Sequence, residues 1–283
     1  MGDRGKEEKT LLHLFSPKTM ERLAKYKAHK PARSRRSRNK AAIQNLSMVG
    51  ALHPQELKHP EWLQIRDDGS LFWGGDQEWF PRRRQQKKGC SAVTAAQITA
   101  YMARKSEMVS LFRPYREAAR SSGSVPGDHI YTRTEFCEHM EDLWACLTPG
   151  PLGLPRPSSM QEGLRSFCIS RGLHCYVNLF TVPWYKPRSQ KLYGELRDFI
   201  QNHLLYDMPL AMLSYSKGGL SNLEHWHWVT VIGTRFNPTN KACRLTVLDH
   251  LDYKEIDLDA WFAKSVWGGA FVACEGRALY ATD

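Results

Sequence analysis

Cys90 is the residue of this 283-residue chain whose type and position most clearly suggest chemistry. It follows Gly89 and opens a run of helix-forming residues, so we expect its thiol at a helix N-terminus. Unpaired backbone N–H groups and the positive end of the helix dipole favour a nucleophilic thiolate there. Five basic residues between positions 82 and 88 favour it further. The competing interpretation is a small buried hydrophobe, as most free cysteines are.

Two further residues could complete a catalytic set with this thiol. His227 begins a strand-like run, and Asp249 ends the run that follows it. Adjacent antiparallel strands would place the imidazole and the carboxylate side by side, which is how a general base is oriented beside a thiol. Lone histidines are usually structural, so the hypothesis depends on all three residues together. With Cys90 on a helix and the other two on a sheet, we expect the site in a cleft between two layers.

Helices dominate the first half of the chain and strands the second, which predicts an α+β fold. Apolar residues at helical spacing predict a mostly buried helix over residues 90–104, and another helix over residues 190–205. Thr132 with Glu135, and Ser158 with Gln161, have the spacing of capping boxes at two further helix starts. Sequential strands should pair with one another while the helices pack to one side. The predicted strands cover residues 174–182, 209–215, 225–236, 244–250 and 270–274.

Several short blocks resemble a known family. They are residues 74–80 with a Gly-Gly-x-Gln element, 89–101, 227–233, Asp249 and 255–259. In this order, over about residues 70–265, they are similar to bacterial papain-like cysteine peptidases, in the branch of the double-glycine leader peptidases, cysteine peptidase family thirty-nine. The resemblance implies a papain-like fold in which a helical part carrying the nucleophile packs on an antiparallel sheet. It implies Cys90 as nucleophile, His227 as general base and Asp249 as the residue that orients the imidazole, without a cofactor.

The chain departs from the family pattern at the oxyanion hole. The glutamine side chain that assists the cysteine N–H in papain-like enzymes normally stands six residues before the cysteine, where this chain has Arg84. Gln77, in the Gly-Gly-x-Gln element, is the leading replacement, and Gln85 and Gln86 are alternatives. Ser91 and Ala92 also replace the Gly-Pro that commonly follows the cysteine, which removes no reacting group. The chain lacks a transporter segment, so we do not expect an exporter's processing domain in cis.

The remaining histidines, cysteines and tryptophans receive structural interpretations. His225 and His227 share one face of a predicted strand, but no further ligands have convincing spacing, so no metal is expected. His250 should point to the opposite face from Asp249. Trp226 and Trp228 either shield the base from water or fill the sheet. Seven cysteines without a Cys-x-x-Cys pair argue against a zinc knuckle and a disulfide framework. Five of them are assigned to the core: Cys137, Cys146, Cys168, Cys175 and Cys274.

The positive charge is concentrated at the N-terminus. The net charge is +11, and residues 1–40 carry +9 of it, with 13 Lys or Arg and 4 Asp or Glu. These residues are predicted to be a basic, disordered tail, because like charges repel and little can be buried. Residues 41–283 form the predicted peptidase domain, with a lead-in at 41–69 and a core at 70–283. No apolar run approaches the length of a membrane helix and no signal-peptide pattern is present, so a cytoplasmic protein is expected.

The leading functional hypothesis is a cysteine peptidase that cleaves peptide or isopeptide bonds in a peptide or protein through an acyl-thioester. Transfer to an amine and deamidation use the same chemistry, and the sequence does not choose among them. The alternative is a nucleic-acid-binding or interaction protein on an inactive peptidase-like scaffold, which would bind nucleic acid through the basic tail. A degenerate peptidase is the third possibility, suggested by the missing glutamine at position 84. Substrate specificity and oligomeric state stay open.

Overall fold

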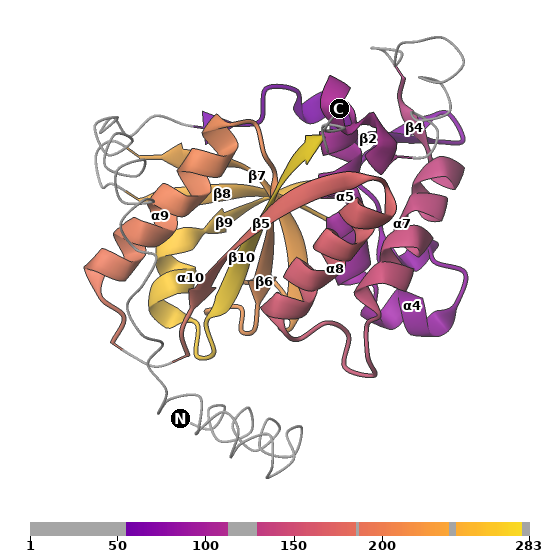
Figure 1. Ribbon diagram of the computed structural model, residues 1–283. Coiled ribbons are helices and arrows are strands. Elements are labelled where there is room, and N and C mark those ends of the chain that lie inside the picture. The colour runs from indigo at the N-terminus through magenta and orange to yellow at the C-terminus, as the bar shows by residue number, and fades with distance from the viewer. Residues whose placement is uncertain (1–54, 113–128, 185–186, 238–241, 279–283) are drawn as a thin grey trace. The chain divides into compact units, whose positions relative to one another are not determined.

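An antiparallel sheet from the C-terminal half forms the centre of the fold (Figure 1). The computed structural model describes residues 55–112, 129–184, 187–237 and 242–278. The strand order is β5-β10-β6-β7-β8-β9, and β1 (Gln55–Glu56) pairs with β7. The six ordered strands are β5 (Leu173–Val182), β6 (Leu210–Ser214), β7 (His227–Phe236), β8 (Cys243–Asp249), β9 (Asp252–Asp257) and β10 (Gly269–Ala278).

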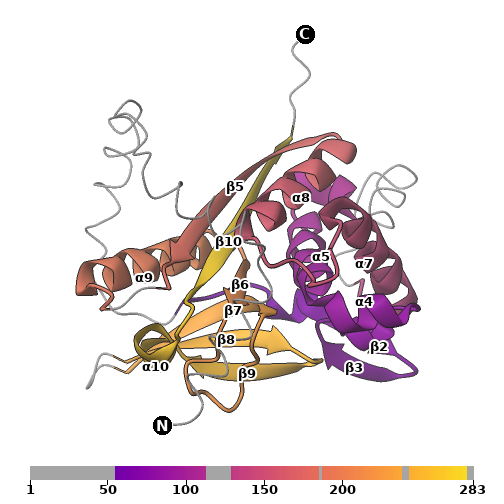
Figure 2. The same cartoon turned by 90° about the horizontal axis from the view of Figure 1, so that it is seen from below.

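Helices cover both faces of this sheet, as Figures 1 and 2 show. On one face lie α5 (Cys90–Ala103) and α8 (Pro157–Ser170), with α7 (Arg133–Leu147) packed against them. On the other lie α9 (Gln190–Leu205) and α10 (Leu258–Lys264). The prediction that the helices pack to one side was therefore wrong. Every residue of β6 is buried, with Ala211 and Leu213 in one core and Leu210 and Met212 in the other, so both faces need cover.

A second, small sheet precedes the nucleophile helix. It has the order β3-β2-β4, formed by β2 (Gln64–Asp67), β3 (Ser70–Trp73) and β4 (Tyr131–Thr132). Asp68 and Gly69, both with positive φ, make the two-residue turn between β2 and β3 that an Asp-Gly pair favours. The remaining elements are the 3-10 helices η1 (Pro60–Leu63), η2 (Gln77–Trp79) and η3 (Ser106–Leu111) and the short helix α4 (Arg83–Lys88).

The predicted helices are confirmed with one correction at a cap. Helix α5 begins at Cys90, α9 spans the predicted residues 190–205, and Thr132 and Glu135 form the predicted capping box of α7. The second predicted box is wrong, because α8 begins at Pro157 and the Gln161 side chain donates to the Val177 carbonyl instead. Proline suits the first helical position because its fixed φ is preorganised and its missing N–H would have no partner there.

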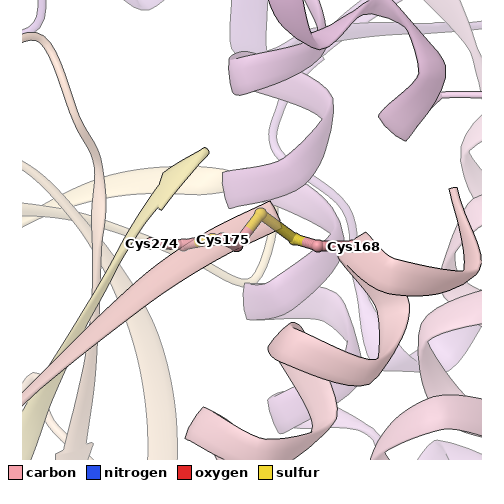
Figure 3. A group of neighbouring side chains, drawn as sticks. All are labelled: Cys168, Cys175 and Cys274. Atoms are coloured by element: carbon pink, nitrogen blue, oxygen red, sulfur yellow. A yellow bond between two sulfur atoms is a disulfide. The ribbon is translucent and has the colours of Figure 1, made fainter. Parts of the chain in front are cut away.

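The cysteines depart from the sequence-based expectation at one pair. Cys168, near the end of α8, and Cys175, in β5, form a disulfide (Figure 3). The tight turn after α8 reverses the chain and brings their Cα atoms to 6.0 Å, within the usual range for a disulfide. Cys274 of β10 is a buried free thiol beside this pair, as assigned to the core. Cys137 and Cys146 are only partly buried.

The predicted tail, residues 1–40, and the first part of the lead-in lie outside the described residues. The described residues all belong to one compact unit that spans residues 52–283. Within them, no helix has the length and apolar character that crossing a membrane requires.

Candidate active site

Cys90 stands where the chain passes from α4 into α5. The helix packs against β7, and its residues from Ser91 onward are buried, whereas the Cys90 side chain is only partly buried. A Cβ atom at Gly89 would lie 2.5 Å from the Gln85 carbonyl oxygen and 2.6 Å from the Phe80 ring. Only glycine therefore fits at position 89, where α4 lies close to the start of α5. The thiol is thus held at the first residue of a helix whose first backbone N–H groups have no partner within the helix.

His227 and Asp249 lie at the same end of two neighbouring strands. Strands β7 and β8 are antiparallel, with Thr230 opposite Leu248, so the start of β7 lies beside the end of β8. The Nε2–H of His227 donates a hydrogen bond of 2.7 Å to Oδ1 of Asp249, and both side chains are buried. Since Nε2 is occupied, the interaction of this imidazole with the Cys90 thiol falls to Nδ1. The structure therefore brings the three predicted residues together.

The electrostatics of this group favour a protonated imidazole. Burial acts to lower the pKa of His227, but the hydrogen bond to Asp249 and the interactions with Cys90 outweigh it and raise the pKa to about 10. Burial likewise acts to raise the pKa of Asp249, and its contacts with His227, Lys254 and His250 lower the pKa to about 2. The buried carboxylate is thus ionised and faces an imidazolium.

A tight turn after β8 returns two more side chains to the site. His250 and Leu251 have φ values of 50° and 66°, the left-handed pair typical of a two-residue hairpin turn, and β9 follows at once. Lys254 of β9 donates a hydrogen bond of 2.8 Å to Oδ2 of Asp249. Both carboxylate oxygens of Asp249 are therefore engaged.

His250 does not point away from Asp249, so that prediction was wrong. Its ring stacks on His227, with centroids 5.5 Å apart and 5° between the planes, and its Nε2 lies 3.7 Å from Oδ1 of Asp249. Its Nδ1 lies 3.1 Å from Oδ2 of Asp76, and this hydrogen bond is the main reason that the pKa of His250 is raised. Strand alternation, on which the prediction depended, ends at Asp249 because the next residue takes a positive φ.

The Gly-Gly-x-Gln element brings Gln77 to the cleft. Gly74 has a positive φ, and a Cβ atom there would lie 2.3 Å from Nε2 of Gln97 on α5; at Gly75 it would lie 2.3 Å from the Phe136 ring. The two glycines thus let the segment run close against the helices. Asp76 caps η2 by accepting from the Glu78 N–H at 2.7 Å, and the next residue, Gln77, lines the same cleft as Cys90 and His227.

The alternative glutamines are directed elsewhere. Gln85 is buried and donates to Glu141 at 2.7 Å, and Gln86 donates to the Phe80 carbonyl at 2.9 Å. Arg84, at the position of the family glutamine, donates to the Pro149 carbonyl. Among the three candidate glutamines, only Gln77 lines the cleft, and its Oε1 is buried without a hydrogen bond. That oxygen therefore does not hold the Gln77 side chain in a structural hydrogen bond.

The residues next to His227 in the sequence, Trp226, Trp228 and His225, lie in different surroundings. Trp228 is buried in the core between the sheet and α5, and its Nε1–H donates to the Leu154 carbonyl at 2.9 Å, so it fills the fold. Trp226 precedes β7 with a φ of 55° and its ring contacts Tyr215. Because β7 begins at His227, His225 is not on the strand. The predicted pairing of two imidazoles on one strand face was therefore wrong.

Sequence reasoning missed three polar residues of the site: Asp76, Lys254 and Gln97. Gln97 is buried on α5, lines the cleft and accepts a hydrogen bond from Thr230 of β7. A long amide side chain in a helix otherwise made of small, apolar or hydroxyl-bearing residues and Tyr101 was the available signal for it. Asp76 and Lys254 have no local signal, because their contacts depend on how distant segments pack.

Comparisons with known proteins find similarity to solved structures. No family model matches the chain, and no curated protein matches it. The structure is similar to the crystal structure of UfSP from C. elegans, with 12% sequence identity and a TM-score of 0.40. The match covers 83% of this chain and 37% of that one, so this chain spans well under half the length of its neighbour.

Proposed function

We propose that this protein is a cysteine peptidase of papain-like fold that cleaves peptide or isopeptide bonds. One observation carries the proposal: a single imidazole, that of His227, is bonded to Asp249 at 2.7 Å through Nε2 and interacts with the thiol at the start of α5. A thiol, a base beside it and a carboxylate that orients the base are the set required for nucleophilic acyl transfer. All three residues line one cleft.

The proposed reaction has two stages. The Cys90 sulfur attacks the substrate carbonyl carbon, and the resulting oxyanion accepts hydrogen bonds from the Cys90 backbone N–H and the Gln77 side chain. The C–N bond then breaks as His227 donates its proton to the leaving amine, which leaves an acyl-thioester. In the second stage His227 takes a proton from water, the hydroxide attacks the thioester, and the carboxylic acid departs as the sulfur is released. No cofactor enters either stage.

The resemblance to double-glycine leader peptidases supports the same assignment through the Gly-Gly-x-Gln element. In this structure the two glycines permit the close approach of the segment that carries Gln77. A peptide or protein is the proposed substrate class. The nucleic-acid-binding alternative depends on the basic tail, which lies outside the described residues, and no contact of the described residues favours it.

Thiol reactivity tests the proposal without knowledge of the substrate. Five free cysteines are present, at positions 90, 137, 146, 243 and 274, and each can be followed by peptide mapping after brief exposure to iodoacetamide at pH 6. We expect Cys90 to alkylate fastest, and His227→Ala to remove that advantage, because a thiol activated by its partner reacts where ordinary thiols are protonated. Cys137→Ala, which removes a half-buried thiol outside the cleft, is the matched control. Equal alkylation of Cys90 and Cys137 would contradict the proposal.

A second test uses turnover. A mixed peptide library incubated with the protein should yield new N-termini that mass spectrometry detects, and Cys90→Ala should abolish them. Deamidation would instead leave the chain intact and add about 1 Da, and transfer to an added amine would attach that amine to the new C-terminus, since all three share the acyl-thioester. Products that persist in the Cys90→Ala variant would show that another group carries the activity.

A further inference from the structure

Three metal-ligating atoms from separate residues converge beside the cleft. One ring nitrogen each from His227 and His250 and a carboxylate oxygen of Glu224 all lie within 4.8 Å of one another. Nδ1 of His227 is 4.0 Å from one carboxylate oxygen of Glu224, and Nε2 of His250 is 3.5 Å from the other. The two imidazole planes are nearly parallel, 5° apart. Both rings thus direct a nitrogen toward the same carboxylate.

The opposite nitrogen of each ring is held by a buried carboxylate. Nε2 of His227 binds Asp249 at 2.7 Å, and Nδ1 of His250 binds Asp76 at 3.1 Å. In metal sites a carboxylate behind the histidine fixes the ring orientation and makes the ligating nitrogen a better donor. Two neighbouring surface histidines without such carboxylates would lack this fixed ring orientation. Its presence on both rings is the second, independent observation that points to a metal ligand set.

The donor types select zinc among the common divalent ions. Two imidazole nitrogens and one carboxylate oxygen, with a fourth position left for water, form a usual zinc set, whereas magnesium and calcium prefer oxygen ligands. Zinc ligands at about 2.0–2.2 Å from the ion lie roughly 3.3–3.6 Å from one another in a tetrahedron. The separation of Glu224 and His250 already has this value. The Glu224 side chain is 61% exposed, so it has room to adjust to the ion.

We propose that Glu224, His227 and His250 bind a zinc ion that reversibly blocks the active site. The ion would bind Nδ1 of His227, the nitrogen that faces Cys90, and release the proton held there to solvent, and so withdraw the base from the thiol. Zinc binding itself does not depend on the peptidase assignment. The inhibitory consequence does rest on the proposed function, and the two are measured separately.

The binding test uses the full chain with any affinity tag removed and no added thiol, so that Cys168 and Cys175 stay paired. Zinc is titrated in competition with a chromophoric chelator. One equivalent should bind to the wild type, and Glu224→Gln and His250→Asn should each weaken binding about tenfold or more. Asp76→Asn, which removes only the carboxylate behind His250, should weaken it about 10–100-fold. Glu195→Gln, an exposed acid on α9, is the matched control and should leave binding unchanged.

Circular dichroism of each variant separates loss of the site from loss of the fold. Wild-type affinity in folded Glu224→Gln and His250→Asn variants would overturn the proposal and assign the zinc to other groups such as the free thiols. Absence of zinc binding by the wild type would overturn it outright. Neither result bears on the peptidase assignment.

The inhibition test follows alkylation of Cys90 with and without saturating zinc. We expect zinc to slow it in the wild type and to have at least about tenfold less effect at the same concentration in Glu224→Gln, with each rate divided by the rate of the same variant without metal. Rapid wild-type alkylation at saturating zinc would overturn the inhibitory role. Slow wild-type alkylation without metal, together with stoichiometric zinc binding, would instead contradict the proposed peptidase function and leave the metal site standing.

Discussion

Lys254 donates a hydrogen bond of 2.8 Å to Oδ2 of Asp249, the carboxylate whose other oxygen accepts from His227. The lysine comes from β9, which pairs with β8 through the two-residue turn at His250 and Leu251. With both oxygens engaged, the carboxylate plane is fixed, and so is the imidazole bonded to it. In the proposed reaction, Lys254 would be a positioning residue that acts through Asp249.

Replacement of Lys254 by methionine should slow the proposed reaction without weakening substrate binding. The methionine keeps much of the side-chain volume and removes the charge-assisted hydrogen bond, which contributes on the order of 1.5–3 kcal/mol. We expect kcat to fall roughly tenfold while KM stays the same, because the lysine does not line the cleft around Cys90. Steady-state kinetics on a cleaved peptide measure this split. Lys191→Met, which replaces an exposed lysine of α9, is the control, and a change in KM alone would contradict the positioning role.

Gln77→Ala should remove the proposed side-chain donor of the oxyanion hole. Loss of one such donor typically lowers kcat by about 10²–10³. Alkylation of Cys90 by iodoacetamide passes through no oxyanion, so its rate should stay at the wild-type value. Gln86→Ala is the matched control, because that amide donates to the Phe80 carbonyl away from the cleft. If Gln86→Ala lowers kcat as much as Gln77→Ala does, the donor has been assigned to the wrong residue.

The sequence predicted those parts of the site that depend on local structure. Cys90 at a helix start and two residues at strand ends follow from periodicity and turn residues, which report the local chain. The position of His250 was wrong because one residue with positive φ reverses the alternation of a strand. Lys254 and Asp76 could not be predicted, since their contacts need the pairing of β8 with β9 and the packing of a segment 174 residues distant from His250.

In the fold, too, features set by neighbouring residues were predicted, and features set by contacts between distant segments were missed. Helix α9 matched its predicted bounds because the apolar spacing of a helix is a local feature of the sequence. It was not predicted from the sequence that helices cover both faces of the sheet. A strand that is buried along its whole length, such as β6, is typical of that arrangement. The bond between Cys168 and Cys175 was missed because spacing alone does not reveal a helix followed at once by an antiparallel strand.

The disulfide between Cys168 and Cys175 should stabilise the fold modestly. It closes a short loop, with a sequence separation of 7, for which the chain-entropy model gives about 2.5 kcal/mol. Cys168→Ala/Cys175→Ala should lower the free energy of unfolding by about this amount in oxidising buffer, as chemical denaturation measures. The wild type treated with a reductant should lose a similar amount. Cys146→Ala is the control, and a reductant-insensitive wild type would show that the bond does not form in solution.

His203 on α9 should make the fold less stable as the pH falls. Its Nδ1–H donates to the Phe199 carbonyl at 2.6 Å and its Nε2 accepts from the Asn178 amide at 3.2 Å, a pair of bonds that requires the neutral ring. Burial lowers the pKa of His203, and the Phe199 carbonyl and Glu275 only partly offset it. The unfolded chain, with a histidine pKa of about 6.5, therefore binds the proton more readily.

The contribution of His203 is consequently full above about pH 6.5 and declines as the pH drops from there toward the lower pKa of the folded state. His203→Gln has no titrating ring, so its free energy of unfolding should change less between pH 7 and pH 5 than that of the wild type. Urea denaturation at both pH values measures the difference. Replacement of His174, a histidine on β5, by glutamine is the matched control and should keep the wild-type dependence. A steeper fall in His203→Gln than in the wild type would mean that the folded state holds the proton at His203 after all.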